Sequence, residues 1–570
     1  MATSIKRTIQ AGALALKRHR DGRHFKYSHL SIHRRQIRIL VLSPGRYNDE
    51  LRAEVRFVNI DDPHHLRYEA VSHSCAVTTG DLKPIKVGTT RRLWVQPTIA
   101  VMLQHLRYQD ENRALWIDQL CINQDDLVEK SAQALMVTDV FKAADRAVVW
   151  LGPEGADSSN AFSLLEDLGW MVEFDFDNMR MRPSAAGIDE PSWADPKEEL
   201  PYDQDGVWSV YELIYRTWFG RVSSRQEIAA KPANATVVCG FRTISWDLLR
   251  TALGCFANKP RAHLESPDSP VELRFARRYD MILLLCQTNK VYDLCTLLEQ
   301  SRLFSCPNPL DRIYSVLSLA VNSDPFMGLT PNYELSKTEL YLDTTFRHIN
   351  YTKTTNILAS CEGASVSLAA SEMPSWVPDW SRKRRANAMP LHFASSHSEA
   401  RVQIESNILH AHAIQCGTVK STVDLFSDYV PVLRALAAIR RCAPLDVLTS
   451  SYNGQCSLLE AYCATLAWGL FDCLHSPPVE TYPNSETSTE ALRRLLATPT
   501  DPVSLGSAAQ AADENAELQP KQELEDPRLV SLRTKLREAD VEATFETTDD
   551  LLEPSILRAA GINVQDIQLV

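Results

Sequence analysis

The chain has 570 residues, of which 44% are hydrophobic, 23% charged and 8% aromatic. This composition is typical of a soluble globular protein and excludes a wholly disordered, collagen-like or coiled-coil chain. The formal net charge of −12 at pH 7 argues against a nucleic-acid-binding role for the chain as a whole.

The two ends of the sequence carry opposite charge. Residues 1–38 hold ten Lys or Arg against one acid, Asp21, whereas residues 501–570 hold fifteen acids against six bases. The ends could therefore attract each other or attract different partners. Residues 1–25 predict a disordered basic tail, although an Arg-rich, acid-poor start is also typical of a mitochondrial transit peptide.

Two strand-like runs follow the tail, at residues 37–42 and 54–60, and the dipeptide Pro44-Gly45 predicts a turn between them. They predict an antiparallel lead-in. After it, three short apolar runs alternate with two helical-period segments, the pattern of βαβ units and a doubly wound parallel sheet. The runs are 70–74, 114–117 and 147–151, and the segments are 98–108 and 126–144, the latter with Leu127, Leu135, Met136, Val140 and Phe141 as its apolar face.

The rest of the chain is mainly helical and then acidic. Residues 153–205 are rich in Pro, Ser and Asp and predict a surface insertion with one helix at 162–171. Further predicted elements are helices at 207–218 and 222–230, a strand at 236–239, mostly helix from 246 to 320, and helices near 428–441 and 458–473. Residues 476–530 are rich in Pro, Ser, Thr, Glu and Gln and predict an unstructured segment.

The cysteines and the hydropathy of the sequence are used to predict the cellular compartment of the protein. The thirteen cysteines include no Cys-x-x-Cys pair, so neither a disulfide framework nor a zinc site is indicated. The sequence has no run of about 18 apolar residues that could span a bilayer. We therefore expect a cytoplasmic protein, with mitochondrial and nuclear placement left open, and no metal, nucleic-acid partner or membrane span.

Polar residues follow two of the predicted parallel strands. Ser72 and His73 close the first run, and Asp118 follows the second, with Asn123 and Gln124 just beyond. Ligands bind outside the carboxyl ends of such strands, which meet at one edge of the sheet, so these residues predict a site there. The alternative is structural, because Asp125 or Asp126 could simply cap the next helix.

The run LWIDQLCINQDD at 115–126, with Glu129, a helix and VVWLG at 148–152, resembles the fungal heterokaryon-incompatibility (HET) domain. Supporting matches are IRILVL (37–42), YEAVS (68–72), WFGR (218–221), QEIA (226–229), VVCG (237–240) and Trp246, and downstream LDRIYSVLSLA (310–320), PNYELS (331–336) and PSWVPDWS (374–381). The resemblance covers residues 26–381. It implies a HET domain at 26–240 (core motifs 68–152 and 218–240, insertion 153–205) and a helical extension at 241–381, leaving a mixed α/β region at 382–475 and an acidic low-complexity linker and tail at 476–570.

The resemblance also implies a fold and a chemistry. The family core is similar to the Toll/interleukin-receptor fold, a flavodoxin-like parallel sheet, here with an antiparallel lead-in, a mostly helical α+β C-terminal region and a disordered acidic tail. Some proteins of that class cleave NAD at its nicotinamide N-glycosidic bond with a glutamate on a helix after a Trp-containing motif, and Glu227 occupies the matching place. The implied site has Glu227 as the catalytic residue and the following pocket residues: Ser72, His73, Asp118, Asn123, Gln124, Arg221 and Gln226.

The implied biology is fungal self/non-self recognition and regulated cell death. NAD would be a substrate and no cofactor is expected, while the partners would be a second copy or another incompatibility protein. Family members usually follow the serine of the first motif with an aromatic residue and close the motif with Trp-Gly, whereas this sequence has His73, Cys75 and Ala76. It also has Ser223 where Trp is usual, so two aromatic positions beside the expected pocket are lost. These losses favour an alternative in which the domain is a non-catalytic interaction module. A third reading, nucleophilic hydrolysis by Cys75 or Cys121 with His73, has the residue types but no family support.

Overall fold

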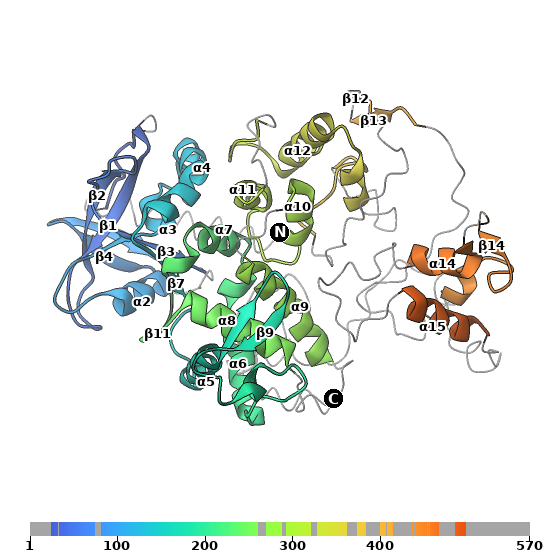
Figure 1. Ribbon diagram of the computed structural model, residues 1–570. Coiled ribbons are helices and arrows are strands. Elements are labelled where there is room, and N and C mark those ends of the chain that lie inside the picture. Colours follow the sequence, from blue (N-terminus) through green and yellow to red (C-terminus); the bar gives the residue numbers. More distant parts are fainter. Residues whose placement is uncertain are drawn as a thin grey trace, which may run out of the picture.

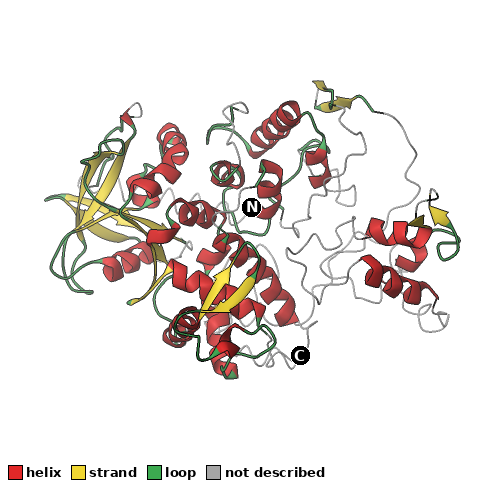
Figure 2. Ribbon diagram, in the orientation of Figure 1, coloured by secondary structure: helices red, strands yellow, loops and turns green. Residues whose placement is uncertain are grey.

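The computed structural model describes residues 24–31, 34–74, 81–259, 270–287, 292–320, 328–361, 373–382, 399–405 and 407–413, and then short stretches between 436 and 497. Residues 1–23 of the predicted basic tail and the acidic end beyond residue 497 lie outside the described residues. Phe25, the last residue of the predicted disordered tail, corrects that prediction, because it is buried in the core and its backbone N–H donates to the Arg92 carbonyl at 2.9 Å. Figure 1 shows the order of the elements along the chain, and Figure 2 separates the strand-rich N-terminal part from the helix-rich part that follows it.

One nine-stranded sheet, in the order β11-β10-β7-β3-β6-β1-β2-β4-β5, forms the centre of the α/β fold. Strands β6, β3, β7 and β10 are parallel, and β1 lies antiparallel to both β6 and β2, so the parallel core and the antiparallel lead-in are confirmed. The strands are β1 (Gln36–Leu42), β2 (Arg52–Asn59), β3 (Glu69–His73), β4 (Lys83–Val87), β5 (Arg91–Val95), β6 (Arg113–Trp116), β7 (Arg146–Trp150), β10 (Ala235–Cys239) and β11 (Arg242–Ser245).

The inner strands β3 and β7 are buried almost along their whole length because they are covered on both faces. All five residues of β3 are buried, as are the last four of β7, which is typical of parallel strands flanked by helices. The hairpin of β4 and β5 was not predicted from the sequence. Its strands carry charged residues on their exposed side and only two buried apolar residues each, a pattern too short to distinguish from a loop.

Helix α4 (Leu127–Ala143) forms as predicted, but its buried face differs from the prediction. Leu127 and Leu135 are 41% and 62% exposed, whereas Glu129 and Gln133 are buried together with Met136, Val140 and Phe141. The two polar residues are buried because they find partners there: Arg38 pairs with Glu129, and Gln133 Nε2 donates to the Gln36 carbonyl at 3.0 Å. The other helix of this region, α2 (Pro97–Leu106), matches its prediction.

Helix α5 (Ser158–Met171) was expected in a surface insertion and is instead a core helix. Its residues Phe162, Leu165 and Leu168 are at most 1% exposed, and it packs against α6 (Gln204–Ile214) and α8 (Trp246–Asn258). A Cβ on Gly169 would stand 2.7 Å from a backbone carbonyl of α8, so the two helices touch through this glycine. The remaining elements between α5 and α6 are the hairpin β8 (Val172–Asp175) and β9 (Arg180–Pro183) and the short helix η2 (Pro191–Ala194).

The mostly helical extension is confirmed and shares one hydrophobic core with the sheet. None of the described helices is long and apolar enough to cross a membrane. The elements from η3 to η5 are η3 (Thr217–Gly220), α7 (Val222–Ala230), η4 (Pro232–Asn234), α9 (Pro270–Cys286), α10 (Leu294–Ser301), α11 (Asp311–Leu317), α12 (Lys337–Thr352) and η5 (Asn356–Ser360).

One prediction for the C-terminal segments is wrong. Residues 476–530 were predicted to be unstructured, but helix α15 (Ser485–Ala497) lies within them and packs on α14 (Leu458–Leu466). Leu492, Leu495 and Leu496 recur at helical spacing and give this helix an apolar face. Leu492 belongs to the same buried cluster as Leu459, and Leu495 and Leu496 pack against that cluster. Most of the helix predicted near 428–441 lies outside the described residues. Short hairpins complete this part: β12 (Val402–Glu405) with β13 (Ile408–Ala411), and β14 (Ser451–Tyr452) with β15 (Cys456–Ser457).

Candidate functional site

A hydroxyl at the carboxyl end of β3 links the sheet to the helix that carries the predicted catalytic carboxylate. Ser72 Oγ donates a hydrogen bond to Glu227 Oε2 and accepts one from the indole Nε1 of Trp218 at 2.7 Å. Ser72 and Trp218 are at most 1% exposed. The Trp218 indole therefore fixes the serine, and the serine fixes one oxygen of Glu227.

The other oxygen of Glu227 pairs with a cation. Arg221, the residue immediately before α7, donates through Nη2 to Glu227 Oε1. Burial raises the pKa of Glu227, which is 6% exposed, and nearby Asp118 adds to this rise, while Arg221 and the hydroxyls of Ser72 and Ser223 lower it. The site thus holds a desolvated carboxylate whose charged form is stabilised by named partners, a common arrangement at functional sites.

His73 lies beside a second carboxylate. Its Nδ1 is 3.8 Å from Asp118 Oδ1, beyond hydrogen-bonding distance, and the histidine is 3% exposed whereas the Asp118 side chain is 47% exposed. Burial lowers the pKa of His73 and Arg221 lowers it further, while Asp118 raises it. Asp118 begins the short helix α3 (Asp118–Cys121), which places its side chain just beyond the end of β6.

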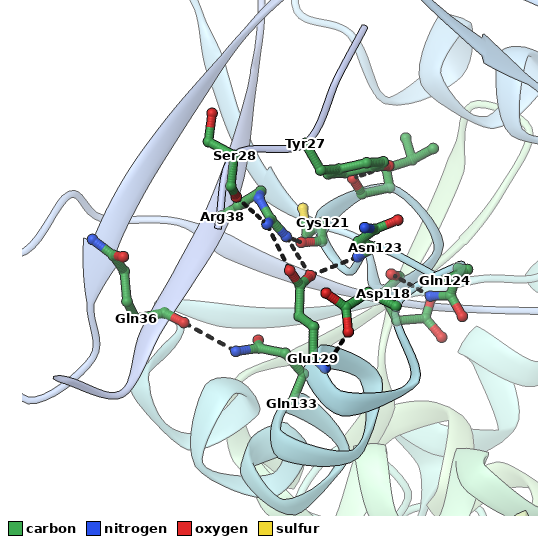
Figure 3. Close-up of polar contacts among 12 residues, drawn as sticks. Tyr27, Ser28, Gln36, Arg38, Asp118, Cys121, Asn123, Gln124, Glu129 and Gln133 are labelled. Carbon is green, nitrogen blue, oxygen red and sulfur yellow. Dashed lines mark hydrogen bonds and ion pairs between the residues drawn. The ribbon is translucent and has the colours of Figure 1, made fainter. Parts of the chain in front are cut away.

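Three of the predicted site residues have structural partners instead of lying with Glu227. Gln226 Nε2 donates to Thr138 Oγ1 on α4 at 3.0 Å, and Gln124 Nε2 donates to the backbone carbonyl of Asp118 at 3.1 Å. Asn123 contributes its backbone N–H, which donates to Glu129 Oε1 at 2.7 Å (Figure 3). The structure therefore brings Ser72, Arg221 and Glu227 into direct contact and places His73 next to Asp118.

A buried ion pair beneath the loop explains much of the motif at 115–126. Arg38 on β1 binds both oxygens of Glu129 on α4, at 2.5 and 2.8 Å, and also donates to the carbonyls of Cys121 and Ser28 (Figure 3). Asp126, the second of the two residues considered as a helix cap, accepts hydrogen bonds from the first turn of α4. These contacts fix both ends of the loop that carries Asp118.

Two residues of the helical extension that were not assigned a role from the sequence contact each other, and one of them contacts α4. Asp311, the first residue of α11, accepts a hydrogen bond from the Tyr333 hydroxyl at 2.6 Å. Burial raises the pKa of Asp311 and nearby Asp118 also raises it, whereas Tyr333, Lys130 and Arg221 lower it. The motifs around both residues were recognised in the sequence, but nothing there indicates that Tyr333 packs against α4.

Two other kinds of chemistry can be compared with the structure: nucleophilic attack by a cysteine, and metal binding. Burial raises the pKa of the Cys121 thiol to about 12, so it is not a nucleophile at neutral pH, and Cys75 lies outside the described residues. Within the described part of the chain, no group of three or more His, Cys, Asp or Glu residues is placed to hold a metal ion. The described site holds a buried carboxylate, Glu227, paired with Arg221, and a buried histidine, His73.

Comparisons with known proteins agree with the sequence resemblance. Residues 68–227 match the family model described as heterokaryon incompatibility protein (HET), and this region ends at Glu227. The chain is 27% identical over 325 residues to the "Heterokaryon incompatibility protein 6, OR allele" of Neurospora crassa, an alignment covering 48% of this chain and 46% of that protein. The chain thus spans about half the length of this relative. No solved structure matches the chain.

Proposed function

We propose that this chain, as a protein with a HET domain, acts in heterokaryon incompatibility and does so by cleaving the nicotinamide N-glycosidic bond of NAD. The observation that carries the proposal is the Glu227 carboxylate, buried at the carboxyl end of β3 and held by Ser72 and Arg221. In this reading Glu227 is the catalytic residue, and the outcome in the cell is regulated death after fusion of unlike fungal cells.

The strand order supports the fold that this proposal assumes. The four parallel strands lie side by side in the sheet as β6-β3-β7-β10. Numbered by their order along the chain, they are strands 2-1-3-4, which is how the flavodoxin-like strand order begins. That order has its switch point between β3 and β7, and ligands bind outside the carboxyl ends of the strands at such a point. Ser72 and His73 stand at that end of β3. The proposal therefore includes a core similar to the Toll/interleukin-receptor fold.

The reaction needs stabilisation of a positive charge on the ribose more than it needs an acid. As the bond breaks, its electron pair stays on nicotinamide, which leaves as a neutral base, and the ribose becomes oxocarbenium-like. A Glu227 anion facing the ring stabilises that charge. A water oxygen then bonds to the same ribose carbon, and neutral His73 accepts its proton, with Asp118 stabilising the resulting imidazolium.

A specific observation also favours the non-catalytic alternative. Both oxygens of Glu227 already have partners, and only 6% of the residue is exposed, so the carboxylate could serve to hold α7 against β3. In that case the domain would act by assembling with a second copy or with another incompatibility protein.

Nicotinamide release from NAD by the full chain tests the proposal. The variants are Glu227→Gln and, as a matched control, Glu173→Gln, whose side chain is 54% exposed in the β8-β9 hairpin. We expect turnover that is lost in Glu227→Gln and kept in the control, measured with dilute and with concentrated protein. Turnover that survives Glu227→Gln refutes the site. Absence of turnover in folded protein, together with self-association by light scattering, favours the interaction module.

A further inference from the structure

Arg221, the cation that pairs with Glu227, is held at its backbone by a segment of the helical extension. The Ser305 N–H donates to the Gly220 carbonyl at 2.6 Å, and the Val222 N–H donates to the Ser305 carbonyl at 3.2 Å. Arg221 and Ser305 therefore lie opposite each other as in a parallel bridge. These two bonds hold the backbone on both sides of Arg221, and Ser305 lies outside residues 68–227, the region that matches the family model.

The turn 302–306, which carries Ser305, is itself fixed by a buried guanidinium. Arg312 on α11 donates through Nη1 to the carbonyl of Ser301, the last residue of α10, and through Nη2 to the Phe304 carbonyl at 3.0 Å. Arg312 and Phe304 are 2% and 1% exposed. A buried cation that binds two carbonyls just before Ser305 gives this residue a defined position.

Helix α7 meets the same part of the extension at a second point. Arg225 donates through Nη1 to Gln300 Oε1 on α10 at 2.7 Å, and its guanidinium lies 5.1 Å from the centre of the Tyr292 ring. Arg225 is 6% exposed, so this contact is buried. The extension therefore contacts α7 both just before its first residue and at Arg225.

The side chain of Arg221 has to reach Glu227 from a position outside the helix. Arg221 precedes α7 in an extended conformation, with φ −91° and ψ 132°, so the direction of its side chain depends on where this backbone lies. We propose that the turn 302–306 positions Arg221 for its ion pair with Glu227, and that Arg312 is the positioning residue that holds the turn. The helical extension thus completes the site. The inference rests on Glu227 being the working carboxylate of the proposed function.

Loss of the turn should weaken the pair between Arg221 and Glu227. With its cation further away, the charged form of Glu227 is less stable, so the pKa of Glu227 rises. Ser305→Pro removes the N–H that binds Gly220 and alters no charge, so a shift in this variant comes from the position of Arg221. The charged or titratable groups around α7 that this variant leaves in place include Arg225 on α7, His73 on β3, Asp118 at the start of α3, Lys130 on α4, Arg278 on α9, and Asp311 and Arg312 on α11.

The ionisation of Glu227 can be followed without any substrate. Trp218 donates to Ser72, which donates to Glu227, so the environment of the Trp218 indole changes when Glu227 gains or loses a proton. The full chain is labelled with 5-fluorotryptophan and its ¹⁹F NMR spectrum is recorded from pH 4 to 9. The Trp218 resonance is the one missing in Trp218→Phe, and its Glu227-dependent titration is the one missing in Glu227→Gln.

We expect the midpoint of that titration to rise by about half to one pH unit in Ser305→Pro and in Arg312→Met, as expected when a cation moves away from a carboxylate. Arg221→Gln removes the cation itself and should give the largest rise. Ser305→Ala is the matched control, because it keeps the backbone N–H and changes only an exposed side chain, and it should shift nothing.

An unchanged midpoint in folded Ser305→Pro overturns the inference, because a turn that only stabilises the fold would leave the titration of Glu227 as it is. If that variant does not fold, Arg312→Met decides by the same criterion. A wild-type Trp218 resonance that does not titrate also overturns it, since Arg221 would then have no ionisation of Glu227 to set. A shifted midpoint without NAD cleavage refutes the proposed activity but keeps the role of the turn, and NAD cleavage with an unchanged midpoint does the reverse.

Discussion

Breaking the ion pair between Arg38 and Glu129 should strongly destabilise the region around β1 and α4. Arg38 is 1% exposed and Glu129 5%, and the two share hydrogen bonds of 2.5 and 2.8 Å. Arg38→Met leaves the Glu129 carboxylate buried without its cation. Loss of one partner from a buried pair costs about 3–5 kcal/mol, and we expect a loss of that size in the free energy of unfolding.

Replacing both partners should cost less than replacing one. Arg38→Met with Glu129→Met removes both charges but leaves the Cys121 carbonyl and the Asn123 N–H without their side-chain partners. Each buried polar group without a partner costs about 1–3 kcal/mol. We therefore expect the double variant to lie between the wild type and Arg38→Met.

The loss of stability in the single and double variants can be measured by native-state hydrogen exchange of the α4 amides in the full chain. The described residues form more than one hydrophobic core, and hydrogen exchange reports the free energy of opening of one region separately. The exposed pair of Arg182 and Glu173, with side chains 78% and 54% exposed, supplies the control. Arg182→Met should cost less than about 1 kcal/mol. If Arg38→Met costs no more than Arg182→Met, the buried pair does not hold the loop and the reasoning fails.

Three further predictions concern single sites. Because burial raises the pKa of Glu227 above 4.5, the folded state binds an extra proton between pH 4.5 and the raised pKa. The stability of the wild type should therefore fall relative to that of Glu227→Gln as the pH rises through this window. The difference in Tm between the two proteins measures this effect, and a difference that stays constant with pH would contradict the shift. Gly169→Ala should lower the free energy of unfolding by about 1–3 kcal/mol, because its Cβ would meet a carbonyl of α8 at 2.7 Å. In the control Gly155→Ala the nearest contact of the new Cβ is 3.4 Å, so the loss of stability should be far smaller. Denaturant titration of both variants measures the difference. Iodoacetamide at pH 8 should label exposed Cys442 in the folded protein and buried Cys121 only after unfolding, as read by mass spectrometry of the peptides.

Local patterns were enough to predict the parallel core of the sheet, its antiparallel lead-in and part of the site. Short runs rich in apolar residues mark β1, β3, β6 and β7, and parallel strands bring their carboxyl ends to one edge. Ser72 and Asp118 were therefore placed near that edge from their position after a strand. The placement of Glu227 depended on the family resemblance, because nothing in the sequence of α7 distinguishes it from an exposed helical glutamate.

Long-range pairing explains what the sequence could not predict. Glu129 on α4 is buried because Arg38 on β1 pairs with it. The buried face of α4 therefore differs from the one that its hydrophobic residues predict. Asp311 and Tyr333 come together from two segments of the helical extension, and Tyr333 also contacts Ser131 on α4. Such contacts are properties of the assembled core and leave no local signal.

The position of β10 has a consequence for synthesis of the chain. Strand β7 lies between β3 and β10 in the sheet, but the segment between Trp150 and Ala235 must be made before β10 can pair with it. At roughly 5–20 residues per second, translation leaves that edge open for several seconds. During this interval a nascent chain on the ribosome presents unpaired Val148 and Val149, so co-translational chaperone binding should be concentrated there until β10 emerges.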